Sequence, residues 1–285
     1  MIPRTLFSSD HETFRDTVRK FLENEAVPHH EEWEQTGQVP KALWRKAGEQ
    51  GFLCPMVSEE YGGIGADFLY SVVVSEEISR AGLTGIGWGL HTEIVAPYIE
   101  HYGSEEMKQR LLPKMVSGEL IGAIAMSEPG AGSDLQGVKT NAVKDGDHYI
   151  LNGSKTFITN GQNADIVIVV AKTDPSKGAK GTSLLIVEEG MEGFQKGKNL
   201  KKVGMKAQDT SELFFQDVKV PAENLIGDEG MGFIYLMQEL PQERLGIAIN
   251  GLAMAESAFE HTLDYVKERK AFGQRVADFQ NTQFK

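Results

Sequence analysis

The spacing of apolar residues changes twice along this chain, and these two changes restrict its possible folds more than any other sequence feature. Over residues 9–117, apolar side chains recur at three- and four-residue intervals, which is typical of amphipathic helices. Over residues 120–227, short apolar runs alternate with turn residues, which is typical of strands. Helical spacing returns at Met231 and continues to Lys285. The sequence therefore predicts an α+β protein in which a block of strands separates two helical blocks.

These changes divide the chain into three expected domains. We expect an N-terminal α-helical domain over residues 1–118 and a middle domain over residues 119–228, built as an antiparallel β-barrel or sandwich. Residues 229–285 are expected to begin a C-terminal α-helical bundle domain. The chain stops at Lys285 without a helix cap or a glycine, so we expect this last domain to be incomplete.

Individual elements can be placed from start and stop signals. Ser9-Asp10-His11-Glu12 has the spacing of a capping box, and Pro40 suits the first position of a helix. Asp145-Gly146 and Asn152-Gly153 are both typical of tight turns between strands. Further helices are expected over residues 68–81, 94–102 and 104–116. Strands are expected over residues 121–126, 149–151, 155–159, 166–170, 183–187, 212–215 and 218–220.

Composition excludes several classes of protein. The chain carries 29 basic and 41 acidic residues, a net charge of −12, and a negative surface repels nucleic acid. A single cysteine, Cys54, and seven scattered histidines exclude a disulfide framework and argue against a metal site. The longest apolar run, residues 166–171, is far short of the ~20 residues that a membrane-spanning helix requires. Residues 1–4 lead into polar sequence without an apolar signal region, so we expect a cytoplasmic protein.

Two neighbouring segments are candidates for binding a ligand. Ser127–Asp134 places small residues, hydroxyls and free backbone N–H groups after an expected strand, which suits a ligand with polar oxygens such as a pyrophosphate. A tight surface loop explains the same residues equally well. Phe157–Thr159 pairs an aromatic with a hydroxyl at the end of another expected strand. That pair suits a flat ring, but it is also ordinary strand sequence.

Glu239 and Glu243 are candidate acid–base residues. They lie four residues apart and so share one face of the expected last helix. Arg244 follows directly, and Pro241 between them is expected to kink the helix or to free a backbone carbonyl. Most glutamates on helices are solvated, so position alone does not identify a base. The lysine-rich segment 196–206 is interpreted mainly as a solvated loop.

Three motifs taken together resemble one enzyme family. Ser127–Asp134, Asn152–Gly161 and Glu268–Gly273 occur in the order and at the distances typical of the acyl-CoA dehydrogenase family, and the resemblance covers essentially the whole chain. Gln238–Leu245 looks most like the long-chain branch of that family. The resemblance implies a helical domain, a β-domain and a second helical domain, with FAD bound between the last two.

The resemblance also implies roles for individual residues. FAD contacts are implied for Ile124, Ala125, Met126, Ser127, Gly132, Ser133, Phe157, Ile158, Thr159, Arg269, Phe272 and Gln280. The last three of these would reach the FAD of a neighbouring subunit in a homodimer or homotetramer. Substrate contacts are implied for Ser133, Pro241, Gln242 and Arg244. No metal is implied.

The implied reaction is α,β-desaturation of a medium- to long-chain fatty acyl-CoA. In the long-chain branch the base that removes the α-proton comes from the helix with the Glu-Arg pair, so Glu243 is the expected base and Arg244 a fixed cation beside it. Electrons would pass to an electron-transferring flavoprotein. Two alternatives stay open: an inactive paralogue or assembly partner, and a flavin oxidase or monooxygenase. The Glu243–Arg244 pair favours the dehydrogenase, because a monooxygenase needs no carboxylate to remove an α-proton.

Overall fold

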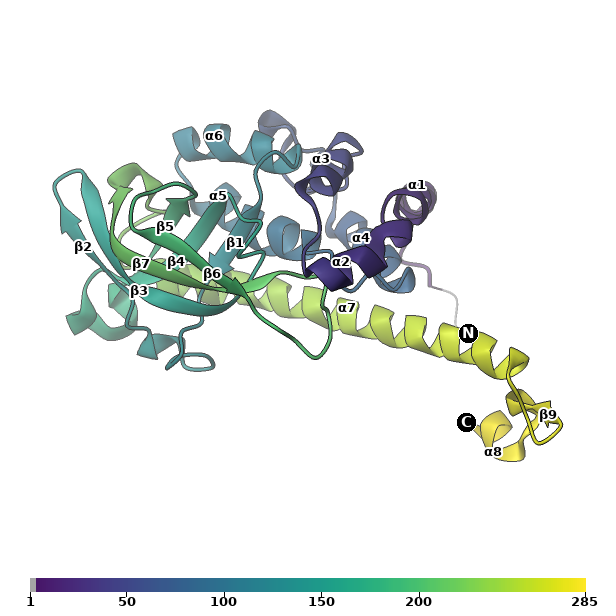
Figure 1. Ribbon diagram of the computed structural model, residues 1–285. Helices are drawn as coiled ribbons and strands as arrows, with labels where there is room; N and C mark the ends of the chain where they lie inside the picture. The colour runs from purple at the N-terminus through teal and green to yellow at the C-terminus, as the bar shows by residue number, and fades with distance from the viewer. Residues whose placement is uncertain (1–3) are drawn as a thin grey trace.

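The computed structural model describes residues 4–285, so the first three residues of the predicted N-terminal opening lie outside the described part. A helical unit and a curled β-sheet lie side by side, and one long helix runs along both (Figure 1). The helical unit precedes the sheet in sequence, and the long helix follows it. This order confirms the predicted α+β fold. The predicted domain boundaries, 118/119 and 228/229, fall in segments that connect these elements.

Six α-helices make up the N-terminal unit. They are α1 (Ser9–Glu25), α2 (His30–Thr36), α3 (Lys41–Glu49), α4 (Phe68–Arg80), α5 (Ala96–Tyr102) and α6 (Glu105–Val116). The helices predicted over residues 68–81 and 104–116 correspond to α4 and α6. The helix predicted over residues 94–102 starts earlier than expected, because a π-helix over Leu90–Val95 leads into α5.

The predicted helix starts are each displaced by one residue. The cap of α1 is Ser8, whose Oγ accepts a hydrogen bond from the N–H of His11, while the His11 ring accepts one from the N–H of Ser8. The capping box therefore begins at Ser8 and not at Ser9, because a histidine can accept the return bond. Pro40 is the N-cap of α3, and Lys41 is its first helical residue.

Seven strands form one curled sheet. They are β1 (Gly122–Ala125), β2 (Asn141–Asp145), β3 (His148–Thr159), β4 (Ile166–Lys172), β5 (Thr182–Glu188), β6 (Phe194–Asn199) and β7 (Thr210–Pro221). Their order is β1-β4-β2-β3-β7-β6, with β5 paired to β4. The predicted antiparallel pairing holds for β2–β3, β3–β7, β6–β7 and β4–β5. In addition, β1 and β2 pair with β4 in parallel, which the sequence pattern does not reveal.

Asn152-Gly153 is not a turn, and this correction joins two predicted strands into one. Gly153 lies inside β3 with a φ of +150°, where the register between β3 and β7 shifts. A glycine at such a register shift is typical of a β-bulge. Because the chain continues through it, β3 unites two predicted strands, and β7 likewise unites two. The Asp145-Gly146 turn is confirmed, since Asp145 pairs with His148 around Gly146, which has a φ of +62°.

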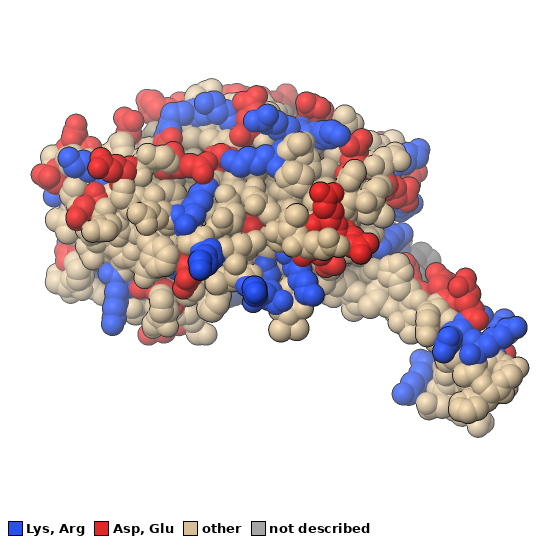
Figure 2. Space-filling model, viewed as in Figure 1, with Lys and Arg blue, Asp and Glu red and all other residues tan. Residues whose placement is uncertain are grey.

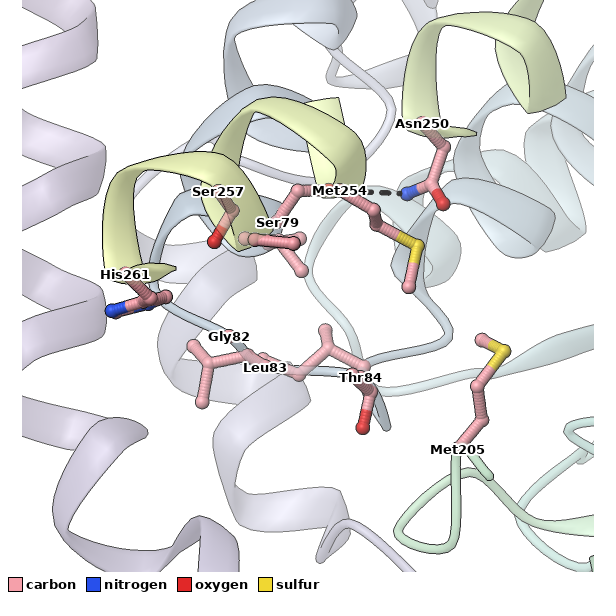
Figure 3. A pocket seen from close by; sticks show the side chains of 12 residues that line it. Ser79, Gly82, Leu83, Thr84, Met205, Asn250, Met254, Ser257 and His261 are labelled. Atoms are coloured by element: carbon pink, nitrogen blue, oxygen red, sulfur yellow. Dashed lines mark hydrogen bonds between the residues drawn. The ribbon is translucent and has the colours of Figure 1, made fainter. Parts of the chain in front are cut away.

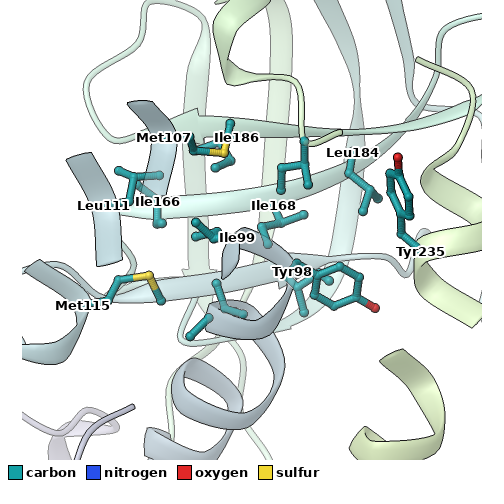
Figure 4. Close-up of a cluster of buried hydrophobic side chains, with 14 of the residues drawn as sticks. Tyr98, Ile99, Met107, Leu111, Met115, Ile166, Ile168, Leu184, Ile186 and Tyr235 are labelled. Atoms are coloured by element: carbon teal, nitrogen blue, oxygen red, sulfur yellow. The ribbon is translucent and has the colours of Figure 1, made fainter. Parts of the chain in front are cut away.

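Two hydrophobic clusters lie on the two faces of the sheet. On one face, side chains of α5 and α6 pack against alternate residues of β4 and β5 (Figure 4). The helices contribute Ile99 and Leu111 to this cluster, and the strands contribute Ile168 and Ile186. The intervening residues of β4, such as Val167, point to the other face and join the core enclosed by the curled sheet. Since both faces of β4 are buried, its sequence is a continuous apolar run without polar alternation.

The long helix α7 (Gly232–Glu268) connects the sheet to the N-terminal helices. It has 37 residues and contacts β5, α5 and α4. It continues through Pro241, which lies inside it. Beyond it, the short strands β8 (Lys270–Ala271) and β9 (Gln274–Arg275) and the helix α8 (Gln280–Phe284) form a small segment that stands away from the main body (Figure 1).

Neither the distribution of charge nor the single cysteine indicates where a functional site lies. Figure 2 shows basic side chains interspersed with acidic ones on the visible face of the molecule. Within residues 4–285, no helix is long and apolar enough to cross a membrane. The same residues contain no group of three or more His, Cys, Asp or Glu side chains that could hold a metal ion. Cys54 is buried and free.

Candidate active site

A buried ion pair anchors the loop that follows β1. The Nζ of Lys155 on β3 lies 2.9 Å from Oε1 of Glu128 and donates a second hydrogen bond to the carbonyl of Met126. The Glu128 carboxylate also accepts hydrogen bonds from the backbone N–H groups of Lys139 and Thr140. Three segments of chain, namely the loop itself, β3 and residues 139–140, therefore meet at one carboxylate. This arrangement fixes the start of the Ser127–Asp134 loop against β3.

The loop itself is a tight turn with an exposed tip. Two backbone hydrogen bonds join Glu128 and Ala131, and the N–H of Thr156 donates to the carbonyl of Ser127. Ser127 is half-buried, whereas Gly132 and Ser133 are exposed beyond the turn. The structure thus holds the predicted Ser127 beside β3 and leaves the next two predicted residues open to solvent.

Phe157 is an exposed aromatic side chain on a strained backbone. Its side chain is 70% exposed, and its φ of +59° is unfavourable for a bulky residue. It lies where the register between β3 and β7 shifts a second time, between Lys155 and Ile158. Thr156 next to it bonds to Ser127, so Phe157 stands close to the loop after β1. Nothing in the packing of the side chain requires this strained conformation. The conformation therefore suggests a functional role for Phe157.

The other residues predicted to line a flavin are less accessible. Ile124 packs against the helices of the N-terminal unit, and Ala125 and Ile158 point into the core enclosed by the sheet. These three can offer a ligand little more than backbone groups. Met126 and Thr159 are half-buried at the edge of the same region. The structure therefore brings the two predicted segments together but exposes only some of their side chains.

Glu243 on α7 is buried and has a specific partner. Its side chain accepts a 2.7 Å hydrogen bond at Oε1 from the hydroxyl of Tyr98 on α5. Burial raises the pKa of Glu243 above its ordinary value, although the Tyr98 hydrogen bond and the charge of Arg244 oppose this shift. A buried carboxyl group with a raised pKa is a recurrent feature of general bases.

The pKa of Glu239, one turn earlier, is shifted in the opposite direction. It accepts hydrogen bonds from Tyr102 (2.7 Å) and from the Nδ1 of His101 (2.9 Å). Burial alone would raise the pKa of Glu239, but these two hydrogen bonds outweigh burial and lower it. The two glutamates share a helix face, as predicted, yet they differ because Glu239 has two donors and Glu243 has one.

The predicted substrate-binding residues near Glu243 are accessible. Pro241 and Arg244 are exposed, and Gln242 is half-buried. The positive charge of Arg244 is close enough to favour the ionised form of Glu243. Pro241 lies inside α7 and has no N–H to bond the carbonyl of Met237 one turn earlier, which is the basis of one of the two effects expected from the sequence.

The last three predicted cofactor residues lie far from the loop after β1. Arg269 follows the end of α7, Phe272 lies between β8 and β9, and Gln280 begins α8. Phe272 is 97% exposed and has a φ of +52°. All three belong to the segment that stands away from the main body (Figure 1). Within one chain they do not join the residues around Ser127.

Sequence reasoning missed the partners of the candidate residues. Tyr98, His101 and Tyr102 on α5 hold the two glutamates, and Lys155 holds Glu128. One signal was available for the tyrosines, because Tyr98 and Tyr102 are four residues apart, the same spacing that separates the two glutamates. When polar residues on two adjacent helices share this spacing, each residue on one helix can pair with one residue on the other.

One cavity lies further along α7, between this helix and the end of α4 (Figure 3). Its volume is about 250 Å³, and its walls include Leu83, Ile86, Met205 and Met254. Asn250 at its edge donates a hydrogen bond to Ser79. Seven residues separate Asn250 from Glu243, a distance of about 10 Å along a helix, so the cavity is distinct from the surroundings of Glu243.

Comparison with known proteins identifies the family. Models of the N-terminal, middle and C-terminal domains of acyl-CoA dehydrogenases match residues 8–119, 123–218 and 230–285 in that order. The mitochondrial long-chain specific acyl-CoA dehydrogenase of Sus scrofa is 56% identical over 284 residues, which are 99% of this chain and 66% of that protein. This chain thus spans about two thirds of the length of that relative.

Solved structures agree with the sequence comparison. The crystal structure of an acyl-CoA dehydrogenase from Geobacillus kaustophilus is 57% identical, with a TM-score of 0.96 over 99% of this chain and 75% of that one. An acyl-CoA dehydrogenase complexed with FAD from Bacillus anthracis is 38% identical, with a TM-score of 0.90 over 98% of this chain and 48% of that one. Sequence, fold and domain order thus lead to one conclusion: this chain belongs to the acyl-CoA dehydrogenase family.

Proposed function

We propose that this chain carries out FAD-dependent α,β-desaturation of medium- to long-chain fatty acyl-CoA thioesters, with Glu243 as the base. The observation that carries the proposal is the buried carboxyl group of Glu243, which has one hydrogen-bond donor and a pKa raised by burial. Similarity to a long-chain specific relative supports the substrate class. The Glu243–Arg244 pair favours this reaction over that of a flavin oxidase or monooxygenase.

The residues around the loop after β1 fit FAD. An exposed aromatic side chain, Phe157, stands beside a loop in which Gly132 and Ser133 are exposed. A side chain built at Gly130 or Gly132 would meet nothing within 4 Å, so a ligand can approach the backbone there. Ser127 and Thr159 would hold the polar edge of the flavin, and Gly132 with Ser133 its phosphates. Bound FAD would supply the acceptor for the hydride that leaves the β-carbon.

Glu243 would accept the α-proton of the substrate. Its Oε1 is held by Tyr98, which leaves Oε2 to take the proton. A base works best when its pKa approaches the working pH, and burial shifts Glu243 in that direction. Glu239 is a poorer base because two hydrogen bonds stabilise its charged form. Ser133, Pro241, Gln242 and Arg244 would contact the substrate, with Arg244 as a fixed positive charge beside the carboxylate.

The resemblance also suggests partners. We expect a homodimer or homotetramer in which Arg269, Phe272 and Gln280 reach the FAD of a neighbouring subunit, and the exposure of Phe272 leaves it available for such a contact. An electron-transferring flavoprotein is the expected electron acceptor. The cytoplasmic location stays a prediction, since the Sus scrofa relative is by name mitochondrial.

Anaerobic reduction of the flavin tests this function. The full-length, FAD-loaded protein should lose its flavin absorbance when palmitoyl-CoA is added under nitrogen. Glu243→Gln keeps the shape of the side chain but cannot take the proton, so it should slow this reduction by about 10⁴-fold while FAD and substrate still bind. Glu239→Gln is the matched control, one turn away on the same helix face, and should cost less than tenfold.

Three outcomes would contradict the proposal. If the wild-type protein binds FAD but palmitoyl-CoA does not reduce it, the protein is an inactive relative. If palmitoyl-CoA does not reduce the flavin but another substrate does, and oxygen then reoxidises the reduced flavin, the protein is an oxidase or monooxygenase. If the two variants exchange their effects, Glu239 is the base.

A further inference from the structure

Tyr98 has a position that packing alone does not explain. It is fully buried in the apolar cluster between α5 and the sheet, yet its hydroxyl reaches out of that cluster toward α7 (Figure 4). There it donates its hydrogen bond to Glu243 across 145 residues of sequence. A phenylalanine would fill the same apolar space without placing a polar group there. The hydroxyl therefore has a role that involves Glu243.

We propose that Tyr98 is a positioning residue for proton abstraction: it fixes the Glu243 carboxylate through Oε1, so that Oε2 faces the α-proton of the substrate. This inference rests on the proposed function, because it assumes that Glu243 is the base. Tyr98 itself touches neither substrate nor FAD in the proposal. It acts only through the carboxylate that it holds.

The geometry of the two helices makes this contact selective. Tyr98 and Tyr102 on α5 are spaced as Glu243 and Glu239 are on α7, and each tyrosine bonds one glutamate at 2.7 Å. Tyr102 also stacks on Tyr235, with ring centroids 4.1 Å apart, which fixes the register of the two helices. Two Tyr–Glu hydrogen bonds of similar chemistry thus join the helices, and only the Tyr98–Glu243 pair contains the proposed base.

Titratable groups of α7 itself and of the elements packed against it lie around this part of the helix. Glu239 and Arg244 come from α7, Tyr98 comes from α5, and Glu93 comes from the π-helix that precedes α5. A Cβ atom on Gly246, one turn beyond Glu243, would lie only 2.9 Å from Oε2 of Glu93, so that carboxyl group faces the same part of α7. Burial raises the pKa of Glu93 to about 8, which leaves it mostly neutral at pH 7.

The Tyr98 hydroxyl stabilises the charged form of Glu243 within this buried environment. Burial and the charge of Glu239 both disfavour the carboxylate, whereas the Tyr98 hydrogen bond and Arg244 favour it. Removing the hydroxyl should therefore raise the pKa of Glu243. A hydrogen bond to a charged group is worth about 1.5 kcal/mol or more, which corresponds to about one pH unit.

The pH dependence of flavin reduction tests the proposal. In the full-length, FAD-loaded protein, Tyr98→Phe should move the acidic midpoint of the reduction rate upward by about one pH unit, and the rate below that midpoint should fall about tenfold. Well above the midpoint the rate should stay below that of the wild type, because the carboxylate is no longer fixed with Oε2 toward the α-proton, and KM should change little. Tyr102→Phe is the matched control, because it removes a hydroxyl from Glu239, and it should not move the midpoint upward.

A second measurement needs no FAD. With glutamate labelled by ¹³C at the carboxyl carbon, the Glu243 signal can be identified by its loss in Glu243→Gln and then titrated. Its midpoint should rise in Tyr98→Phe and not in Tyr102→Phe. If Tyr98→Phe folds poorly, 3-fluorotyrosine at position 98 serves instead. It is a stronger donor and should lower the midpoint.

The two hypotheses can fail separately. If Glu243→Gln leaves flavin reduction intact, the proposed base is wrong, whatever Tyr98 does to the titration. If Glu243→Gln abolishes reduction but neither Tyr98→Phe nor the fluorinated protein moves either midpoint, Tyr98 is a packing residue and the present inference is overturned. Equal shifts in Tyr98→Phe and Tyr102→Phe would also overturn it.

Discussion

The Nζ of Lys155 lies 2.9 Å from Oε1 of Glu128 in an ion pair that is almost closed to solvent, with side-chain exposures of 0% and 7%. Burial lowers the pKa of Lys155 to about 8. Burial would raise the pKa of Glu128, but hydrogen bonds from Thr140, Lys139 and Lys155 together lower it. The pair links β3 to the loop after β1, so the stability of the fold and the shape of the candidate FAD site depend on the same contact.

The two halves of this pair should differ in their effect on stability. Glu128→Gln leaves a buried ammonium group without its counter-charge, and we expect it to lower the free energy of unfolding by about 3–5 kcal/mol. Lys155→Met should cost less, because Glu128 keeps two backbone N–H donors. Urea denaturation of both variants measures the difference. The double variant should lose less than the sum of the single losses, and strict additivity would contradict a direct interaction.

His91 should make the protein less stable in mild acid. Its Nδ1 accepts the N–H of Gly122 on β1 and its Nε2 donates to the carbonyl of Met115 on α6, so the neutral ring joins the sheet to the helices. Burial lowers the pKa of His91 from 6.5 to about 4.

The sign of this pH effect follows from the direction of the shift. Because the folded state disfavours the proton, the contribution of His91 is fully present above pH 6.5 and is lost as the pH falls toward 4. The loss amounts to about 3 kcal/mol over that range. Unfolding free energies measured between pH 4 and 7 should show this slope in the wild type. His91→Gln should be less stable at pH 7 but should show a smaller slope, and an unchanged slope would assign it to other groups.

The turn that the sequence predicts at Asn152-Gly153 provides a test of the bulge. A Cβ atom on Gly153 would lie 2.4 Å from Oγ1 of Thr140, and the φ of +150° strains any other residue. We expect Gly153→Ala to lower the free energy of unfolding by about 2 kcal/mol or more. Gly204→Ala is the control, since a Cβ atom there meets nothing within 4 Å. Equal thermal stabilities of the two variants would contradict the close approach of β3 to Thr140.

The elements that the sequence predicted well are those defined by local signals. The helix α6 has a serine cap and a regular apolar face, and β4 is one continuous apolar run. In contrast, β2 has a single buried residue, Ala142, and β6 is mostly polar, so their pairing partners define them and their own patterns do not. Asn152-Gly153 is ambiguous for the same reason, because a turn and a bulge both require a glycine with positive φ.

The candidate site divides in the same way. Family motifs located Glu243 and the Ser127–Asp134 loop, because these segments are contiguous in sequence. Tyr98 is 145 residues from Glu243, and Lys155 is 27 residues from Glu128, so no local pattern joins either pair. The register of α5 against α7 decides which donor pairs with which glutamate. That register depends on packing throughout the interface between the two helices.

The last prediction concerns Phe157, whose exposed ring suggests a stacking surface for FAD. Phe157→Ala should weaken FAD binding about three- to tenfold, because an offset-stacked aromatic pair is worth about 0.5–1.5 kcal/mol. Phe157→Gly should weaken it similarly and also raise thermal stability, since glycine tolerates the φ of +59°. Quenching of flavin fluorescence measures the affinity. A wild-type protein with no measurable affinity for FAD would contradict the cofactor proposal itself.

Phe214→Ala provides the matched control for this experiment. Phe214 on β7 is also an exposed aromatic residue, at 42%, but it has no positive φ and is not among the predicted flavin contacts. Its truncation should leave FAD affinity unchanged within a factor of two. If both variants bind FAD as the wild type does, the flavin does not stack on this part of β3. If both weaken binding equally, general apolar surface rather than a specific ring contact accounts for the affinity.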